Sequence, residues 1–309
     1  MGYYKRVRAY GSTTTAQLIQ QNLPTIVAPL RPDGGKIRCD SLDLTLDPIR
    51  HGFFLKGMPH VQNIAKAKAG RFVATGEGEL EYRNGTVKIV PETAEELLIL
   101  DEVFAGGAYD LVGEGDWIAW DVGMNAGIAA AFFGGIKGWE TVGYEPFPEP
   151  FSVAKANIAR SGLEGKVELR PVGVLDRDVK MALAFNHEYR GRNGLYGNSE
   201  IRNEVTEVEV SFVDADTVLA ELEAKANGRR IFAKIDCEGS EYAIVRRLKQ
   251  TGRLRSIDAI IMEYHLLAPE HDYNGLVNDL TETGFLVHGQ RLSDQVGMIY
   301  AVRADRRQG

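Results

Sequence analysis

The sequence predicts an α/β fold, in which a mostly parallel sheet carries helices on both faces and follows an N-terminal extension of mixed α+β character. Three observations support this prediction. From about residue 91 onward, short apolar segments alternate with segments of helical periodicity, which is typical of a parallel sheet. Asp121 and Asp236 each end an apolar segment just before a turn that contains glycine. The first 90 residues lack this alternation, so we place a domain boundary at residue 90.

The regular part of the chain, residues 91–309, supplies most of the predicted elements. We expect strands at 117–121, 140–145, 167–172, 231–236, 257–263, 285–288 and 296–302. We expect helices at 91–104, 125–136, 151–161, 240–249 and 273–283. Because no helix separates the last two strands, they should form a hairpin, and the sheet should end with one antiparallel strand.

The extension, residues 1–90, has shorter and more varied elements. We expect helices at 15–23 and 60–69, and strands at 37–46 and 71–75. Asn84-Gly85 lies between two alternating segments, which indicates a two-residue hairpin whose turn needs positive φ. We interpret the extension as a substrate lid or a dimerisation arm. The edge of this hairpin favours self-association, with a homodimer as the expected assembly.

Composition argues against several classes of protein. The 309 residues carry 36 Lys and Arg against 43 Asp and Glu, a net charge of −7, which argues against a general nucleic-acid binder. The two cysteines, Cys39 and Cys237, lie far apart, which excludes a disulfide framework and fits a reducing compartment. The longest apolar run, 126–136, is too short for the ~20 residues that span a bilayer. We therefore expect a cytoplasmic protein without a nucleic-acid or membrane partner.

The first candidate site is the segment WDVGMNAG, residues 120–127. Asp121 ends a predicted buried strand and Gly123 permits a tight turn, while Asn125 and Gly127 lead into a helix. Ligands of doubly wound sheets bind at such carboxyl ends of strands. A dinucleotide fingerprint needs three glycines, but only Gly123 and Gly127 are present, so the segment favours a cationic or hydroxyl-bearing ligand. The alternative interpretation is an ordinary strand–turn–helix connection.

Glu145 ends the next predicted strand, in the segment VGYEPFPEP. A carboxylate at this point of a doubly wound sheet accepts hydrogen bonds from the hydroxyls of a ribose. The alternative is a surface glutamate at a strand end. Asp121 and Glu145 together are more specific for a nucleoside ligand than either residue alone.

A third group of carboxylates lies in AKIDCEGSEY, residues 233–242. Asp236 ends a predicted strand, and Glu238 and Glu241 lie at the start of the next helix. A helix N-terminus favours ionised carboxylates there. The alternative for Glu238 and Glu241 is helix capping without any function.

Glu263 and His265 end the following predicted strand, in IIMEYH. Because they are two residues apart, they lie on the same side of an extended strand. A histidine that titrates near neutral pH beside a carboxylate is suited to act as a general base. The alternative is a histidine that is merely packed at a strand end.

Four segments in this order resemble the FkbM-like S-adenosylmethionine-dependent methyltransferases: DVGMNAGIAAAFF, GYEPFPEPFSVAKANI, AKIDCEGSEYAIVRRL and IIMEYH. The resemblance extends over about residues 92–302. It implies the seven-stranded class I methyltransferase fold, which is Rossmann-like, and O-methylation of a hydroxyl with S-adenosylmethionine as cofactor and S-adenosylhomocysteine as product.

The resemblance also implies which residues bind the methyl donor. Asp121, Gly123, Asn125 and Gly127 would hold its methionine and ribose parts, and Glu145 would take the ribose hydroxyls. Gly173 and Val174 would lie at the adenine. Asp236 would lie beside the donor.

Methyl transfer to an alcohol needs alignment of the reacting atoms and a group that takes the hydroxyl proton. Our first choice for this base is His265, oriented by Glu263, and the second is Asp236. We expect this site to hold no metal. The less favoured alternative is a divalent cation on Asp236, Glu238 and Glu263 that would acidify the acceptor.

The segment 177–206 interrupts the regular alternation and is interpreted as an inserted loop that forms a substrate lid. It contains aromatic and basic residues suited to a sugar or an anionic group: Tyr189, Arg190, Arg192, Tyr196 and Arg202. The alternative is a solvated insertion without a role in binding.

The sequence therefore favours an O-methyltransferase that acts on a small molecule, either a sugar or glycan or a polyketide-type product. A second hypothesis keeps the reaction class and moves the acceptor to nitrogen or to a macromolecule. A third is a non-catalytic, donor-binding accessory subunit. A nicotinamide-dependent oxidoreductase is disfavoured because the central glycine of its fingerprint is missing.

Overall fold

The computed structural model describes residues 30–110, 112–187, 189–196 and 205–304. The chain divides into two compact units, of which the first ends at Ala108 and the second begins at Tyr109. The predicted helix at 15–23 lies outside the described residues. Within them, no helix has both the length and the apolar character needed to cross a membrane.

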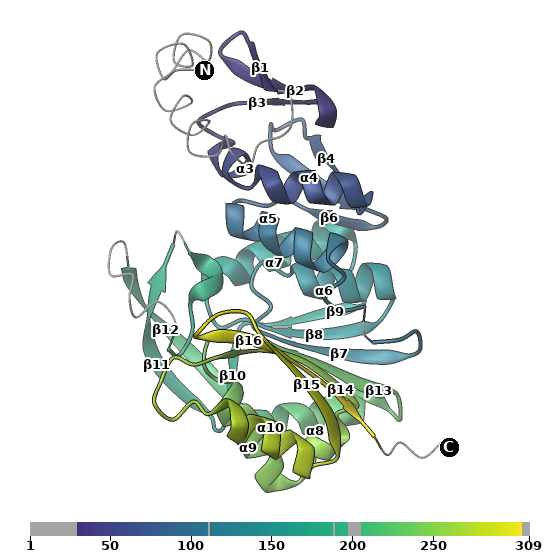
Figure 1. Cartoon of the computed structure of the whole chain (residues 1–309), viewed down its shortest axis with the longest axis vertical. Helices are drawn as coiled ribbons and strands as arrows, with labels where there is room; N and C mark the ends of the chain where they lie inside the picture. The colour runs from purple at the N-terminus through teal and green to yellow at the C-terminus, as the bar shows by residue number, and fades with distance from the viewer. Residues whose placement is uncertain (1–29, 111, 188, 197–204, 305–309) are drawn as a thin grey trace. The chain divides into compact units, whose positions relative to one another are not determined.

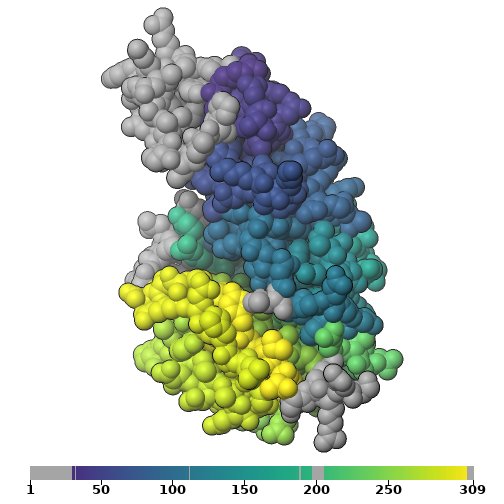
Figure 2. All heavy atoms as spheres, turned by 45° about the vertical axis from the view of Figure 1, so that its right-hand side comes forward, coloured from purple at the N-terminus to yellow at the C-terminus, as the bar shows by residue number. Residues whose placement is uncertain are grey.

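The second unit contains a seven-stranded sheet in the order β15-β16-β14-β13-β7-β8-β9 (Figure 1). Its strands are β7 (Trp117–Val122), β8 (Glu140–Tyr144), β9 (Val167–Arg170), β13 (Arg230–Ile235), β14 (Ala259–His265), β15 (Phe285–Arg291) and β16 (Val296–Arg303). Only β16 runs antiparallel to its neighbours. This confirms the predicted fold class. The antiparallel last strand is inserted between β14 and β15, however, so the sheet ends at β15. The C-terminal hairpin that β15 and β16 form is the yellow part of Figure 2.

Helices cover both faces of this sheet (Figure 1). They are α6 (Ile128–Phe132) with the π-helical turn η3 (Phe133–Lys137), α7 (Pro148–Ser161), α8 (Ala215–Ala226), α9 (Glu241–Thr251), the 3-10 turn η5 (Arg253–Ser256) and α10 (Tyr273–Glu282). Trp120 on β7 is fully buried in one core with Leu219 of α8, Leu248 of α9 and Leu280 of α10. The opposite face of the sheet carries an aromatic cluster in which Phe232 of β13 packs edge-on against Phe133.

Because side chains alternate along a strand, this packing decides where the polar residues of β7 and β13 point. Trp120 faces the core that α8, α9 and α10 cover. Asp121 therefore faces the side of the aromatic cluster, together with Lys234, which follows Phe232 by two residues on β13. The register pairs Asp121 directly with Lys234 across the two strands.

Within the segment predicted as an inserted loop at 177–206, the described residues 179–186 and 205–206 belong to strands, so the loop prediction is wrong for them. We call the small sheet that these strands form the arm. β11 (Val179–Asn186) and β12 (Val205–Asp214) pair antiparallel, and β10 (Gly173–Leu175) joins β12 in a three-stranded sheet. This small sheet has its own apolar cluster, which includes Phe147 and Phe212. Alternating burial along β11 and β12 is the period-2 pattern expected of strands with one exposed face.

The turn of the arm is held by two buried asparagines. Asn193 accepts a hydrogen bond from the Asn186 N–H at 2.7 Å, and its amide nitrogen lies 3.0–3.2 Å from the carbonyl oxygens of Asn186, Tyr189 and Arg190. These bonds fix the 3-10 turn η4 (Arg190–Arg192) against the end of β11. The described part of the turn is therefore an ordered structure with its own hydrogen-bond network.

The first unit combines two small antiparallel sheets with short helices. The sheets contain β1 (Leu30–Asp33), β2 (Lys36–Cys39), β3 (Leu44–Leu46), β4 (Arg71–Ala74), β5 (Leu80–Asn84) and β6 (Val87–Ile89). The helices are η1 (Asp40–Leu42), α3 (Gly52–Lys56), α4 (Met58–Ala67), α5 (Ala94–Leu100) and the π-helical turn η2 (Asp101–Ala105). The single strand predicted at 37–46 is wrong, because η1 and the left-handed Asp43 reverse the chain between β2 and β3.

Two further predictions for this region need comment. The hairpin at 80–89 is present, but Asn84 pairs with Val87, so the two-residue loop is Gly85-Thr86, with φ of 57° at Gly85. The compact units divide after Ala108 rather than at residue 90. The reason is that α5 packs on α3 and α4 of the first unit.

We predict that Asn193→Ala destabilises the protein by about 1–3 kcal/mol, because it leaves buried backbone groups of the arm without partners. Urea unfolding measures this loss of free energy, and limited proteolysis should show faster cleavage within the arm. Lys180→Ala, on the exposed side of β11, is the matched control and should change the stability by less than about 0.5 kcal/mol. Equal stability of the two variants would contradict the prediction.

Candidate functional site

Three neighbouring strands bring the predicted acidic residues to one edge of the sheet. β7 lies between β8 and β13, and the chain passes from β7 to β8 on one side and later to β13 on the other. This is the topological switch point at which doubly wound sheets bind ligands. Asp121 lies near the end of β7, while Glu145 and Asp236 directly follow β8 and β13.

Lys234 is the central charged group of this edge, and its side chain is only 6% exposed. Its ammonium nitrogen lies 3.2 Å from Oδ1 of Asp121 and 3.6 Å from Oδ2 of Asp236, and it donates a hydrogen bond to the carbonyl oxygen of Gly123. Burial opposes the charge, but the charges of Asp121 and Asp236 outweigh it and raise the pKa of Lys234. The amine is therefore a buried cation that connects the tips of β7 and β13.

This arrangement limits what Asp121 can do. Its carboxylate is fully buried and faces Lys234, so its role in the structure is to neutralise the lysine charge. The Asp121 carboxylate faces Lys234 because the strand register places these two residues opposite each other. Direct contact of Asp121 with the methyl donor stays a prediction from the resemblance.

The loop from β7 to α6 contains three left-handed residues, with φ of 74° at Gly123, 49° at Asn125 and 75° at Gly127, and the helix accordingly begins only at Ile128. A Cβ at Gly123 would lie 1.8 Å from the carbonyl oxygen of Asp236. Glycine is thus required here by the close passage of the β13 tip. Among the described residues, Oδ1 of Asn125 is buried and has no hydrogen-bond partner.

Glu145 clamps this loop from the neighbouring strand. Its Oε2 accepts the backbone N–H of Asn125 and its Oε1 accepts that of Phe147, both at 3.0 Å. The residue is 5% exposed, and this burial raises the pKa of its carboxyl to about 7. Glu145 therefore organises the backbone around the predicted ribose position.

The loop from β13 to α9 is organised by another buried carboxylate. Glu241 is fully buried and accepts the backbone N–H groups of Cys237 at 3.1 Å and Gly239 at 2.9 Å. Between them, Glu238 has a left-handed backbone with φ of 53°. The loop thus directs Asp236 and Glu238 toward the end of β14.

His265 meets this loop at the end of β14. Its Nδ1 lies 3.1 Å from Oε1 of Glu241, whereas Nε2 lies 3.6 Å from Glu238 and 3.7 Å from Glu263. The hydrogen-bonded carboxylate is that of Glu241, while Glu263 approaches the other ring nitrogen at ion-pair distance, so orientation of His265 by Glu263 stays a prediction. No pattern local to Glu263 could show this, because Glu241 reaches His265 from another element.

The protonation of His265 bears on its predicted role as a base. Burial disfavours its charge, but the hydrogen bond and charge of Glu241 outweigh this, and Glu238 and Asp236 add to them, so that the pKa of His265 rises to about 10. With no ligand at Nε2 the ring keeps its proton at neutral pH and offers no lone pair. The action of His265 as general base stays a prediction. Asp236, whose side chain is 36% exposed, is the better placed group to accept a proton.

The two predicted adenine contacts, Gly173 and Val174, lie on a strand of the small sheet and are both buried. A Cβ at Gly173 would lie 2.5 Å from the ring of Phe212, and Val174 is 2% exposed in the main core. Both belong to β10. Contact of their backbone with adenine stays a prediction.

The four predicted substrate residues separate into two groups. Arg190 is 9% exposed, with its Nε 3.5 Å from Glu149, and the Arg192 guanidinium lies 5.6 Å from the ring centre of Tyr189. Arg192 and Tyr189 thus contact each other within the arm, and Arg190 contacts Glu149 of α7. Tyr196 instead reaches the site, because its backbone N–H donates to the carbonyl oxygen of Glu238 at 3.2 Å. Arg202 lies outside the described residues.

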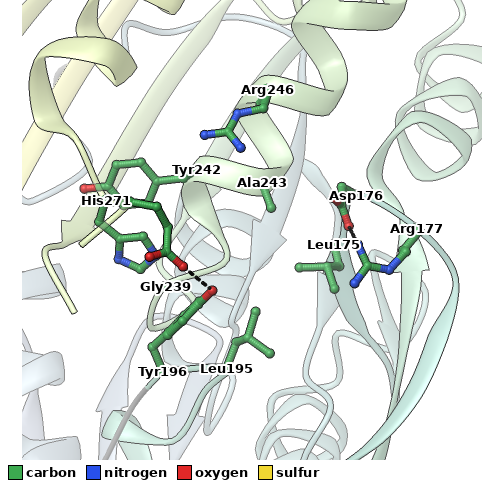
Figure 3. A pocket seen from close by; sticks show the side chains of 11 residues that line it. Leu175, Asp176, Arg177, Leu195, Tyr196, Gly239, Tyr242, Ala243, Arg246 and His271 are labelled. Carbon is green, nitrogen blue, oxygen red and sulfur yellow. Dashed lines mark hydrogen bonds and ion pairs between the residues drawn. The ribbon is translucent and has the colours of Figure 1, made fainter. Parts of the chain in front are cut away.

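A cavity of about 200 Å³ lies between the arm and α9 (Figure 3). On one side Tyr196 donates to Oε1 of Glu270 at 3.1 Å, and the rings of Tyr242 and His271 stack at 4.4 Å. Asp176, Arg177 and Arg246 supply further polar groups to its lining. Gly239 also lines the cavity, so it adjoins the loop that carries Asp236 and Glu238.

Our sequence analysis did not assign a function to Lys234, and it placed Glu241 in a group of carboxylates with helix capping as the alternative. The signal for Lys234 was a charged residue inside the apolar segment IFAKID, because a buried lysine needs partners. Arg246, Glu270 and His271 had no recognisable local pattern. They line the cavity from elements that are separate in the sequence.

We predict that Lys234→Met destabilises the fold by about 3–5 kcal/mol, because it leaves the Asp121 carboxylate buried without its cation. The double variant Lys234→Met/Asp121→Leu should recover most of this loss, as no charge remains uncompensated. Urea unfolding of the two single variants and the double variant gives the coupling. Strictly additive losses would disprove the ion pair as the source of the effect.

We predict a pH-dependent contribution of Glu145 to stability. Since its folded pKa is about 7 and an unfolded glutamate titrates near 4.3, the folded protein retains a proton that the unfolded chain has lost between these values. The stabilising contribution is complete below the unfolded pKa and is lost as the pH rises through 7, by about 4 kcal/mol in total. The difference in unfolding free energy between wild type and Glu145→Gln, measured from pH 5 to 8, should fall accordingly. Glu164→Gln, at an exposed position, should give a flat difference, and a flat profile for Glu145→Gln would refute the prediction.

Comparison with solved structures gives matches of low overall similarity. Precorrin-6y C5,15-methyltransferase from Geobacter metallireducens is 12% identical, with 66% of this chain and 89% of that chain covered and a TM-score of 0.39. TrmK of M. capricolum in complex with S-adenosyl-homocysteine is 12% identical, with 65% and 67% covered and a TM-score of 0.36. The METTL16 methyltransferase domain is 11% identical, with 82% and 93% covered and a TM-score of 0.41.

A comparison with curated proteins finds no match. The model of the methyltransferase FkbM domain, in contrast, matches residues 121–287. The matched segment begins at Asp121 and includes the tips of β8, β13 and β14 with all of their acidic residues. It also covers more than half of the sequence, and this chain therefore belongs to the FkbM methyltransferase family.

Proposed function

We propose that this protein is an S-adenosylmethionine-dependent O-methyltransferase that acts on a hydroxyl group of a small molecule. The observation that carries the proposal is the junction of three strand tips. Glu145, Asn125 and Asp236 come from neighbouring tips at the switch point of the sheet, beside a glycine-containing turn. A nucleoside with a cationic methionine part matches the hydrogen-bond acceptors gathered there.

The residues present fit such a donor. Oδ1 of Asn125 is a buried acceptor without a partner among the described residues, which a donor N–H group would satisfy. Each oxygen of Glu145 accepts one backbone amide, and a carboxylate oxygen has a further lone pair for a ribose hydroxyl. Asp236 offers an exposed carboxylate on the opposite side of the β7 tip.

The chemistry divides between the donor and the protein. The donor supplies a methyl group on a sulfonium, and the sulfur keeps the electron pair of the broken bond. The protein's tasks are to align the acceptor oxygen with that methyl group and to receive the hydroxyl proton. The ordered loops around Asn125 and Glu238 perform the alignment, which is where most of the rate enhancement of such a displacement arises. Asp236 is the proposed proton acceptor.

The cavity beside the β13–α9 loop is the proposed acceptor site. Its volume of about 200 Å³ suits a small ligand or one unit of a larger one. Arg177 and Arg246 on its walls (Figure 3) can donate hydrogen bonds to sugar oxygens or to a carboxylate or phosphate. These donors support a hydroxylated, polar acceptor.

We predict that the protein binds S-adenosylhomocysteine and that Asn125→Gly weakens this binding about tenfold, a loss of about 1.4 kcal/mol. Glycine tolerates the left-handed backbone of this position, so the substitution removes only the side chain. Asn227→Gly is a closely matched control, since Asn227 has the same φ of 49° at the C-terminus of α8. Calorimetry with S-adenosylhomocysteine measures the affinity of the wild type and of both variants. A wild type that binds NAD but not S-adenosylhomocysteine would overturn the proposal.

The acceptor class is tested by a screen with isotopically labelled donor against sugars, glycans, polyketide-type alcohols, amines and tRNA. We expect label in a hydroxylated small molecule, and the chemical shift of the transferred methyl group identifies the bonded atom. Label in an amine or in RNA would overturn O-methylation of a small molecule and leave the donor site intact. Donor binding without transfer to any compound would favour a non-catalytic subunit.

A further inference from the structure

His265 presents a buried ring nitrogen that no hydrogen bond occupies. Its side chain is 4% exposed, and Nδ1 is held by Glu241. Nε2 faces the carboxylates of Glu238 and Glu263 at 3.6 and 3.7 Å, which is beyond a hydrogen bond. No other group among the described residues bonds to this nitrogen, so it is available to a ligand.

The atoms around Nε2 form a compact set of potential metal ligands. One carboxylate oxygen of Asp236, one of Glu238 and a ring nitrogen of His265 all lie within 4.8 Å of one another. Two ligands on opposite sides of an ion, each about 2.1 Å away, are about 4.2 Å apart. Small side-chain rotations are therefore enough to close this set around an ion. We propose that Asp236, Glu238 and His265 bind one divalent metal ion.

Glu241 supports the metal site from the far side of His265. Histidines that bind metals usually donate their second ring N–H to a carboxylate, which fixes the tautomer and the ring orientation. Glu241 accepts from Nδ1 at 3.1 Å and is itself held by the amides of Cys237 and Gly239. A fully buried Glu241 is poorly explained by helix capping, but it is what a supporting residue beneath a metal ligand requires.

The ligand types indicate which ion binds. An imidazole nitrogen favours first-row transition metals over Mg²⁺ and Ca²⁺, whereas carboxylate oxygens suit Mn²⁺. The proposed set mixes both types, and Glu263, with an oxygen 3.7 Å from Nε2, offers a further carboxylate. We therefore assign the site to a transition metal of the Mn²⁺ type.

The role of the ion rests on the proposed O-methylation. An alcohol oxygen bound to a divalent cation loses its proton far more readily than a free alcohol, which makes proton transfer to the Asp236 carboxylate easier. The acceptor hydroxyl would bind the ion, its O–H bond would break, and the proton would pass to a carboxylate oxygen of Asp236 that is not bound to the ion. The oxygen keeps the electron pair for the new bond to the methyl carbon.

The site is tested by titrating chelator-treated, full-length protein with Mn²⁺ and measuring free Mn²⁺ by electron paramagnetic resonance. We expect about one ion per chain and at least a tenfold weaker affinity in Glu238→Gln, because this substitution removes a charged ligand and keeps the shape. Glu164→Gln should bind Mn²⁺ like the wild type. His265→Gln is a second ligand variant, and circular dichroism of each variant monitors its fold. Wild-type protein that binds no Mn²⁺, or a folded Glu238→Gln that binds it unchanged, would overturn the site.

Two further measurements separate this proposal from the proposed function. Calorimetry of S-adenosylhomocysteine on metal-free protein tests the donor site alone, and we expect its affinity to change less than threefold when Mn²⁺ is added. Methyl transfer should fall at least tenfold in chelator and return with Mn²⁺. Full activity in chelator would overturn the role of the ion while the methyltransferase function stands. Failure to bind the donor would overturn that function, and the Mn²⁺ titration would still decide the metal site.

Discussion

The buried ammonium of Lys234 is the interaction on which this edge of the sheet depends. A lysine in the interior of a sheet is tolerated only when its charge and its donors are satisfied, and here the partners come from two strand tips. Asp121 supplies the charge from β7, Asp236 supplies a second one from the end of β13, and the Gly123 carbonyl accepts a hydrogen bond. The two tips are thereby held in one arrangement.

Each of the two loops beyond these tips is held by a buried glutamate that accepts hydrogen bonds from two backbone N–H groups. Glu145 accepts the amides of Asn125 and Phe147, and Glu241 accepts those of Cys237 and Gly239. In each case a buried carboxylate fixes the backbone of a loop through its N–H groups. Sites held in this way need little reorganisation when substrates bind. Two acidic residues that look like binding groups in the sequence therefore serve first as supports of the loops.

The fold was largely predictable, because strands with continuous apolar character alternate with helices from Trp117 onward and the acidic tips follow from that order. Side-chain direction was harder to predict. Whether Asp121 faces a ligand or Lys234 depends on strand register, and whether Glu263 or Glu241 holds His265 depends on a contact between separate elements. The arm was missed although β11 and β12 alternate regularly, since the glycines and asparagines between them suggested a loop. Asn193 shows why that inference failed, because its side chain supplies the hydrogen bonds that order the turn.

The arm and the β13–α9 loop meet in a way that connects the proposed acceptor cavity to the proposed catalytic residue Asp236. Tyr196 donates its backbone N–H to Glu238, and its ring packs so closely on Gly239 that a Cβ there would lie 2.5 Å from it. The hydroxyl of Tyr196 meanwhile binds Glu270 at the wall of the cavity. A ligand that displaces Tyr196 therefore acts on the loop that directs Asp236 and Glu238. Because the arm is a separate three-stranded sheet with its own apolar cluster and also contacts this loop through Tyr196, we expect it to be the part of the fold that sets acceptor specificity.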